Sequence, residues 1–211
     1  LNCKNITLTK LPEGITSIGT ACFQNCTNLA LTELPEGITS LGNNIFNSCT
    51  NLALTELPEG ITSIGNNCFN NCNLILKTLP ESLEFIGNGA FRHYYENHTI
   101  ILAEELNLPN LIDISSTWLD TIFTGQGSGA DTYINNCLPN LKKLYCPKLS
   151  KTNYRYAYGN GILGNHRNNV TAPLLEEVYM PLVTKLGSNF LANCPNLKRF
   201  NSDIDGVADL S

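Results

Sequence analysis

The chain of 211 residues lacks the features that mark several classes of protein. Its 13 Lys and Arg residues are outnumbered by 18 Asp and Glu residues, and no basic run is longer than Lys142-Lys143. Nucleic-acid and anionic-membrane binders carry basic patches, so we expect neither as a partner. No apolar stretch approaches the roughly 18 to 20 residues of a membrane span, so we expect no membrane insertion.

The start of the chain also lacks a charged-then-apolar signal segment, and the first residue is Leu1 rather than Met. We therefore expect the sequence to be a fragment or a processed product, whose start does not report on export.

Motifs for catalysis and cofactor binding are missing as well. The chain has no Ser or Cys nucleophile motif and no Gly-rich phosphate loop, and its three His residues lie in irregular stretches. GNGILGN, from Gly159, does not follow a strand into a helix as a dinucleotide site requires. The sequence predicts a protein that is not an enzyme and takes no cofactor.

What the chain does contain is repetition. CTNLALTELPEGITS occurs from Cys26 and again, letter for letter, from Cys49, and it nearly recurs from Cys3. The unit reads C-x-x-L-x-L-x-x-L-P-x-x-(I/L)-x-x-(I/L)-G-x-x-x-F-x-x. Its recurring slots are Cys3, Cys26, Cys49 and Cys72; Leu11, Leu34, Leu57 and Leu79; Pro12, Pro35, Pro58 and Pro80; Gly19, Gly42, Gly65 and Gly87; and Phe23, Phe46, Phe69 and Phe91.

The second half follows the same frame, with Pro109, Pro147 and Pro181 in the proline slot. Seven units and a partial eighth therefore cover almost the whole chain. We expect a single solenoid domain over 1–211, with regular units of 22 to 23 residues over 1–93, two units with long insertions over 94–171, and terminal units over 172–211.

The two insertions occupy the same phase of consecutive units. The step from the glycine slot to the next cysteine slot takes 7 residues in regular units, but 22 from Ser115 to Cys137 and 19 from Asn153 to Ala172. Because the phase is shared, we expect both insertions to leave the solenoid on one side and to lie next to each other.

A unit this short cannot bury its own apolar face, so the units must stack as coils with a common core. The two-residue spacing of Leu29 and Leu31 predicts a short strand with both side chains inward, ending before Pro35, which has no N–H for a strand ladder. The segment from Gly19 to Cys26 is long enough for one or two helical turns that tuck Phe23 under the coil.

The pattern LPEGITSIG…CF…C resembles the leucine-rich repeats, specifically the BspA-like (Treponema pallidum type) class. The resemblance implies a right-handed solenoid of the α/β class, with a parallel β-sheet on one face and short helical turns on the other. It also implies adhesion or protein binding by a secreted protein, at a cell surface or in the extracellular space. Ser115 and Asn153 depart from the pattern, since each replaces the slot glycine.

The cysteines and carboxylates invite a metal-site interpretation, which the spacing does not favour. Cys22 and Cys26 lie two coils, or about 10 Å, from Cys68 and Cys72, whereas zinc holds each sulfur at about 2.3 Å. We expect buried free thiols and no metal site. The column of Glu13, Glu36, Glu59 and Glu81 is expected to be a solvated face, with a divalent cation as the alternative.

The insertions carry the best candidates for recognition. They bring together large aromatic, Arg and His side chains of the types that dominate binding hot spots, set among adaptable Gly, Ser and Asn residues. The candidate contact residues are Trp118, Phe123, Tyr154, Arg155, Tyr156, Tyr158 and His166.

The expected partner is a protein, such as a host or neighbouring-cell surface protein, or a glycan, and the concave strand face is the second candidate surface. Three alternatives stay open: aromatics that only pack the loops' own cores, a purely structural spacer, and a carbohydrate-binding module.

Overall fold

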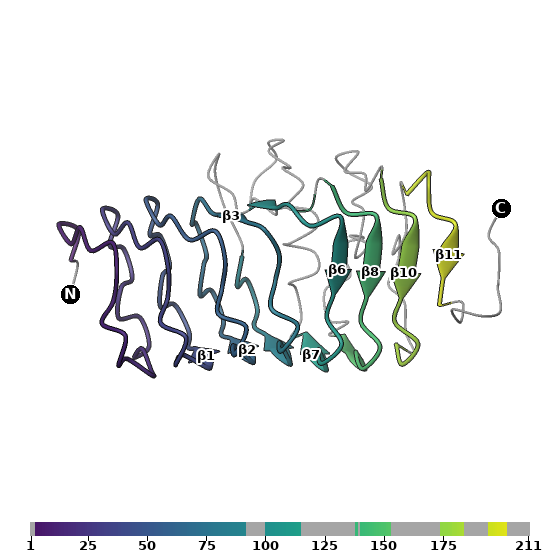
Figure 1. Ribbon diagram of the computed structural model, residues 1–211, viewed down its shortest axis with the longest axis horizontal. Helices are drawn as coiled ribbons and strands as arrows, with labels where there is room; N and C mark the ends of the chain where they lie inside the picture. Colours follow the sequence, from purple (N-terminus) through teal and green to yellow (C-terminus); the bar gives the residue numbers. More distant parts are fainter. Residues whose placement is uncertain are drawn as a thin grey trace.

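The structure is a computed structural model, and it describes residues 3–91, 100–114, 138, 140–152, 174–183 and 194–201. These residues form an elongated row of stacked coils, with the early coils at one end and the late coils at the other (Figure 1). We call residues 3–91 the N-terminal coils and the described residues from 100 onwards the C-terminal coils.

One sheet runs through both groups of coils. It contains five parallel strands in the order β1-β2-β4-β7-β9. Their bounds are Ser40–Leu41 (β1), Ser63–Ile64 (β2), Phe85–Ile86 (β4), Asp113–Ile114 (β7) and Lys151–Thr152 (β9). The paired residues are those just before each glycine slot, and Ile114 pairs with Thr152 just before Ser115 and Asn153. The sheet therefore keeps one register across the units with and without insertions.

A second sheet belongs to the C-terminal coils alone. It contains four parallel strands in the order β11-β10-β8-β6. Their bounds are Glu105–Asn107 (β6), Lys143–Tyr145 (β8), Glu177–Tyr179 (β10) and Arg199–Phe200 (β11). The remaining strands, β3 (Ile75–Leu76) and β5 (Ile100–Ile101), pair only with each other. The coil that contains β5 and β6 thus pairs with the preceding coil through β5 and with the following coil through β6 (Figure 1).

The expected parallel sheets are confirmed, but the strand expected at Leu29 and Leu31 was wrong. Both side chains are fully buried, yet no strand is formed there, and isolated bonds join the coils, such as Ala30 N–H to the Leu8 carbonyl at 3.1 Å. The next inward residue, Leu34, comes three residues after Leu31, so the alternation of a strand does not continue to the proline.

The C-terminal coils do alternate up to the proline. Leu106 and Leu108 are both buried on either side of the exposed Asn107, and β6 ends there, just before Leu108-Pro109. The strands β6, β8 and β10 therefore continue to within two residues of the proline, which cannot donate to the ladder, whereas β3, whose inward Leu76 and Leu79 are three apart, ends at Leu76.

The expected helical turns were also wrong, since the described residues contain no helix. Between Gly19 and Cys26 the chain makes successive turns, with Cys22 N–H bonded to the Gly19 carbonyl at 3.1 Å and Cys26 N–H to the Phe23 carbonyl at 3.0 Å. The N–H groups of Phe23 and Asn25 point to the next coil instead, as in the bond from Phe23 N–H to the Ile45 carbonyl at 3.0 Å, whereas Gln24 N–H bonds within its own coil to the Ala21 carbonyl at 3.1 Å. Bonds between coils thus replace the bonds that a helix would need.

Left-handed backbone at two positions of each such segment also prevents a helix. These residues are Ala21, Asn25, Asn44, Ser48, Asn67 and Asn71, with φ between 51° and 61°. Asn adopts this conformation more readily than most residues, which explains its abundance here.

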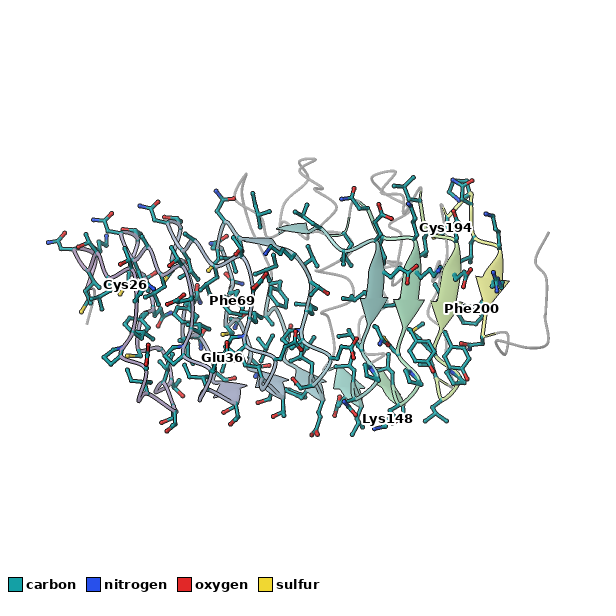
Figure 2. All side chains as sticks on the ribbon, in the orientation of Figure 1. Cys26, Glu36, Phe69, Lys148, Cys194 and Phe200 are labelled. Carbon is teal, nitrogen blue, oxygen red and sulfur yellow. The ribbon has the colours of Figure 1, made fainter. Side chains whose placement is uncertain are left out.

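The core consists of columns in which each side chain stacks on its copy in the next coil. Phe23, Phe46, Phe69 and Phe91 form a ring stack with centroids 5.7, 5.5 and 5.5 Å apart. Beside it the thiol of Cys49 donates to the Phe23 carbonyl at 2.9 Å, and the thiol of Cys72 donates to the Phe46 carbonyl at 3.0 Å. The cysteine slot therefore holds a small apolar side chain that can still donate one hydrogen bond. Figure 2 draws the described side chains on the coils, with Cys26 and Phe69 labelled among them.

Close approach between coils explains glycine at two of the glycine slots, Gly65 and Gly87, whereas a Cβ at Gly42 would have room, with its nearest atoms 3.7 Å away. A Cβ on Gly65 would lie 2.6 Å from the carbonyl carbon of Gly42, and a Cβ on Gly87 would lie equally close to that of Gly65. Gly60, in the same coil as Gly65, has room, since the nearest atom to its Cβ would be 3.8 Å away.

We therefore predict that Gly65→Ala lowers the free energy of unfolding by about 1–3 kcal/mol, because backbone atoms of the preceding coil must move to admit the methyl group. Gly60→Ala is the matched control and should change this free energy by no more than about 0.5 kcal/mol. Urea unfolding followed by circular dichroism measures both. Equal effects of the two substitutions would show that the close approach does not constrain the coils.

Candidate ligand-binding surface

The seven contact residues expected in the insertions lie outside the described residues. They are Trp118, Phe123, Tyr154, Arg155, Tyr156, Tyr158 and His166. Their role as a binding site stays a prediction.

The structure does describe where the insertions attach. They follow β7 and β9, which are neighbours in the five-stranded sheet. The described chain resumes at Leu138 and Leu174, a few residues before β8 and β10, which are neighbours in the four-stranded sheet. Both insertions are therefore anchored on adjacent coils at each of their ends.

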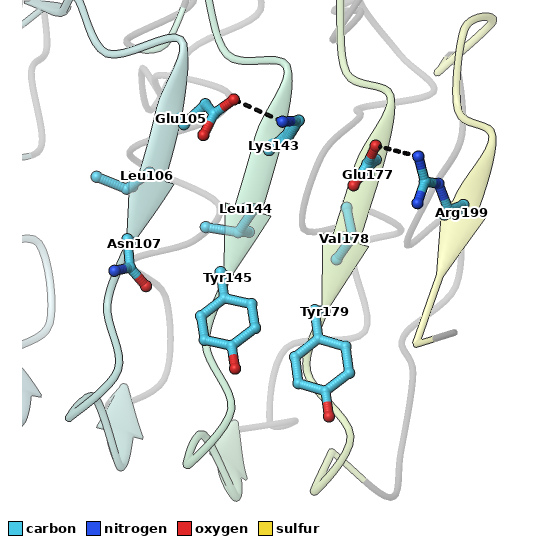
Figure 3. Close-up of a pocket in the computed structure, with 10 residues that line it drawn as sticks. All are labelled: Glu105, Leu106, Asn107, Lys143, Leu144, Tyr145, Glu177, Val178, Tyr179 and Arg199. Atoms are coloured by element: carbon cyan, nitrogen blue, oxygen red, sulfur yellow. Dashed lines mark hydrogen bonds and ion pairs between the residues drawn. The ribbon is translucent and has the colours of Figure 1, made fainter. Parts of the chain in front are cut away.

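The outward face of the four-stranded sheet forms a shallow groove of about 290 Å³. Its walls come from two rows of side chains that flank the buried row of Leu106, Leu144 and Val178 (Figure 3). The first row holds Glu105, Lys143, Glu177 and Arg199, and the second holds Asn107, Tyr145 and Tyr179.

Ion pairs between strands neutralise the charged row. Lys143 Nζ lies 2.6 Å from Glu105 Oε1, and Arg199 Nη2 lies 2.8 Å from Glu177 Oε1 (Figure 3). The hydrogen bond and charge of Glu105 raise the pKa of Lys143, so this amine stays protonated. Pairs as exposed as these add little to stability. Their main effect is that the groove carries no net charge.

A second ladder of ion pairs runs one residue earlier along the same strands. Lys142 pairs with Glu104 at 2.8 Å, and Lys198 pairs with Glu176 at 3.0 Å. Lys198 donates a hydrogen bond to Glu176, which lowers the pKa of that carboxyl. Charge therefore alternates from coil to coil in both ladders.

Two tyrosines give the groove its aromatic surface. The rings of Tyr145 and Tyr179 stack with centroids 5.0 Å apart and planes 9° apart. Within the described part of the chain, neither hydroxyl has a hydrogen-bond partner. Both tyrosines are half-buried, and an aromatic pair at the surface with free polar groups is typical of recognition surfaces.

A second groove, of about 570 Å³, lies on the N-terminal coils among Thr and Glu side chains. Glu33 pairs with Lys10 at 2.8 Å and Glu56 pairs with Lys77, whereas Glu36 and Glu59 belong to the predicted carboxylate column. No group of three or more potential metal ligands occurs among the described residues. This surface is a solvated acidic face in the structure.

The family follows from a comparison with known repeats. The model of the BspA type leucine rich repeat region matches residues 1–107, in six copies. The chain belongs to the BspA-type leucine-rich repeat family. This agrees with its stacked coils and parallel sheets.

A leucine-rich repeat protein from Bacteroides ovatus ATCC 8483 has a similar crystal structure, with 21% sequence identity and a TM-score of 0.35. The match covers 94% of this chain and 56% of that protein, so the BspA-type chain spans little more than half of its length. No curated protein matches the chain.

The BspA-type coils bury their thiols rather than activate them. Burial raises the pKa of Cys49 and of Cys146 to about 12, and it raises those of Cys68 and Cys72 as well. A nucleophilic or metal-binding thiol needs the opposite shift. These four cysteines are free thiols that serve packing.

Within the described residues, no helix is long and apolar enough to span a membrane.

The concave strand face was expected only as the second candidate surface, and its residues were not predicted. The signal was present, because KLYCP and EVYMP put a tyrosine at the same slot of consecutive units.

We predict that iodoacetamide at pH 8 modifies Cys22 in the native protein but leaves Cys49 and Cys146 unmodified. Cys22 is exposed, whereas a buried thiol with a pKa of about 12 is ionised in only about one molecule in ten thousand at this pH. Peptide mapping by mass spectrometry, with and without urea, measures each site. Modification of Cys49 at the rate of Cys22 without urea would contradict the stacked core.

We also predict a loss of stability at alkaline pH. The Cys146 thiol has a pKa of about 12 in the folded chain and about 8.5 in the unfolded chain, so its contribution is intact below pH 8.5 and is lost as the pH rises towards 12. Each such thiol should lower the free energy of unfolding by about 1.4 kcal/mol per pH unit in this range. Cys146→Ala should make the fall less steep in thermal melts from pH 8 to 10, whereas Cys22→Ala should leave it unchanged. Identical slopes would exclude a role for the buried thiol.

Proposed function

We propose that this BspA-type repeat domain is a non-enzymatic protein-binding module, displayed at a cell surface or in the extracellular space. Its ligand surface is built from the two adjacent insertions, and the strand face beside them adds to it. The partner is a protein on a host or neighbouring cell. The family supports this proposal, since large repeat arrays offer extended surfaces for binding.

The observation that carries the proposal is the shared anchoring of the insertions. Ile114 and Thr152, the last described residues before them, are paired in neighbouring strands. Leu144 and Val178, which follow soon after their ends, are also paired. Two long segments fixed to adjacent rungs at both ends can form one composite surface, and loops on rigid scaffolds are where binding residues concentrate.

The competing hypothesis is a structural spacer, for which the coils alone would suffice. The tyrosine groove favours binding over the spacer, because a spacer has no need of a stacked aromatic pair with unbonded hydroxyls at its surface.

Replacement of the insertions tests the proposal. Residues 116–136 and 154–171 are each exchanged for the six residues 43–48 of a regular unit. We expect this variant to lose the surface proteins that the parent chain retains from a biotinylated extract of host or neighbouring cells. Tyr154→Ala combined with Tyr156→Ala should lose most of the same proteins.

The matched control places residues 43–48 in the regular coil, in place of residues 66–71. This variant carries the same kind of graft but keeps both insertions, and it should retain the same proteins as the parent. Equal retention by all variants, with unchanged circular dichroism, would favour the spacer and exclude the proposal.

A further inference from the structure

The tyrosine stack ends abruptly at both sides of the groove. Strand pairing aligns Tyr145 with Asn107 on one side and with Tyr179 on the other, and the next position after Tyr179 is Asn201. The row therefore reads Asn, Tyr, Tyr, Asn over four consecutive coils. Each ring has an aromatic neighbour on one side and a short amide on the other.

The ends of the stack leave ring faces uncovered. Neighbouring strands lie about 4.8 Å apart, which agrees with the 5.0 Å between the two ring centroids. An amide side chain is much shorter than a tyrosine, so it leaves the outer part of the adjacent ring face free. A flat ring lying over Asn107 would continue the stack at its natural spacing (Figure 3).

Polar groups lie beside this free ring face, whereas Tyr179 lies on the opposite side of Tyr145. The Tyr145 hydroxyl has no partner within the described residues, and Asn107 uses its Nδ2 in a 3.0 Å bond to Glu81 Oε1. The carbonyl oxygen of the Asn107 amide can therefore accept a bond from a ligand. An occupant with a flat apolar face and a rim of hydroxyl groups would use both the ring and these groups.

The paired charges of the groove favour a neutral ligand. The two acidic and two basic side chains of the groove are consumed in the Glu105–Lys143 and Glu177–Arg199 pairs. A charged ligand would gain no net attraction and would compete with these pairs. The volume of about 290 Å³ is at the lower limit of small-molecule sites, which suits one or two rings rather than a long chain.

We propose that the groove of β6, β8, β10 and β11 is a subsite for a neutral saccharide, with one pyranose ring packed on Tyr145 over Asn107. An aromatic side chain of a protein partner would use the ring face but not the polar rim, so the sugar fits more of the observed features. This subsite does not depend on protein binding by the insertions.

Saturation-transfer NMR on the full chain tests this proposal. The probes are the methyl glycosides of glucose, galactose and mannose, which are neutral, with N-acetylneuraminic acid and glucosamine as charged comparators. A single ring should bind with a Kd on the order of 1 mM. We expect transfer from the protein to one face of at least one neutral glycoside, and weaker transfer to both charged sugars.

Variants locate the binding site. Tyr145→Ala should lower the affinity by about two- to tenfold through the lost ring contact, and Asn107→Tyr should abolish binding because its own ring fills the space. Tyr145→Phe keeps the ring and should retain most of the affinity, and Leu182→Ala, at an exposed position outside the groove, is the control for surface substitution. Asn107→Tyr decides the question if Tyr145→Ala does not fold.

Three results would overturn the subsite: no transfer to any neutral glycoside, transfer that persists unchanged in Asn107→Tyr, or preferential binding of N-acetylneuraminic acid or glucosamine. The variant without insertions should still bind the sugar. Loss of protein retention with preserved sugar binding, or the reverse, separates the two proposals.

Discussion

Backbone hydrogen bonds from each coil to the next set the spacing on which the rest of the structure depends. Phe46 N–H reaches the Cys68 carbonyl at 3.0 Å and Phe69 N–H reaches the Ala90 carbonyl at 2.7 Å, so successive coils cannot separate or slide. Every slot must then hold a residue that tolerates its own copy one step away. Phenylalanine satisfies this by stacking, cysteine by donating its thiol to the coil before, and glycine by having no Cβ where the backbones meet. The sequence therefore repeats because each slot must fit the same spacing between successive coils.

The stacking of like side chains in columns could be predicted from the sequence, because it requires only that the same residue type recurs at a fixed spacing. The strand positions could not be read from recurrence alone, since they depend on which side chains point inward between two turns. In the N-terminal coils Leu31 and Leu34 are three residues apart and no strand forms at Leu31, whereas Leu106 and Leu108 are two apart and flank the end of β6. This one-residue shift was visible in the sequence, and alternation up to the proline predicts the longer strands of the four-stranded sheet, although the two-residue strand β3 forms at Ile75–Leu76 without it. Helical turns were predicted from the length of the segment between the glycine and cysteine slots alone. That prediction left out the residues with left-handed backbone, most of them Asn, which prevent a helix there.

The two parts of the candidate surface, the insertions and the groove, also differ in how far the sequence predicts them. Insertions interrupt a period, so length alone revealed them and their shared phase, and the structure shows their attachment points on paired strands. The groove does not interrupt the period, and it arises from the identity of neighbours across coils. The residue pairs before each inward position read EE, KK, EE and KR in successive C-terminal coils, which predicts ion-paired ladders once strands are known to be parallel and in register. Comparison of the same slot in successive coils predicts both the ion-pair ladders and the row of tyrosines.

The alternating charges also disfavour incorrect pairing between near-identical coils. Coils with the same residues in every slot can pair with the wrong neighbour while the chain folds, since each offers the same apolar column. In the C-terminal coils a pairing that skipped one coil would place Lys143 beside Arg199, or Glu105 beside Glu177, and like charges directly opposite each other are unfavourable. The correct order brings opposite charges together at every step and leaves no net charge on the outer face. Recognition at that face must then depend on shape, aromatic contact and hydrogen bonds, which are the features that Tyr145, Tyr179 and Asn107 supply.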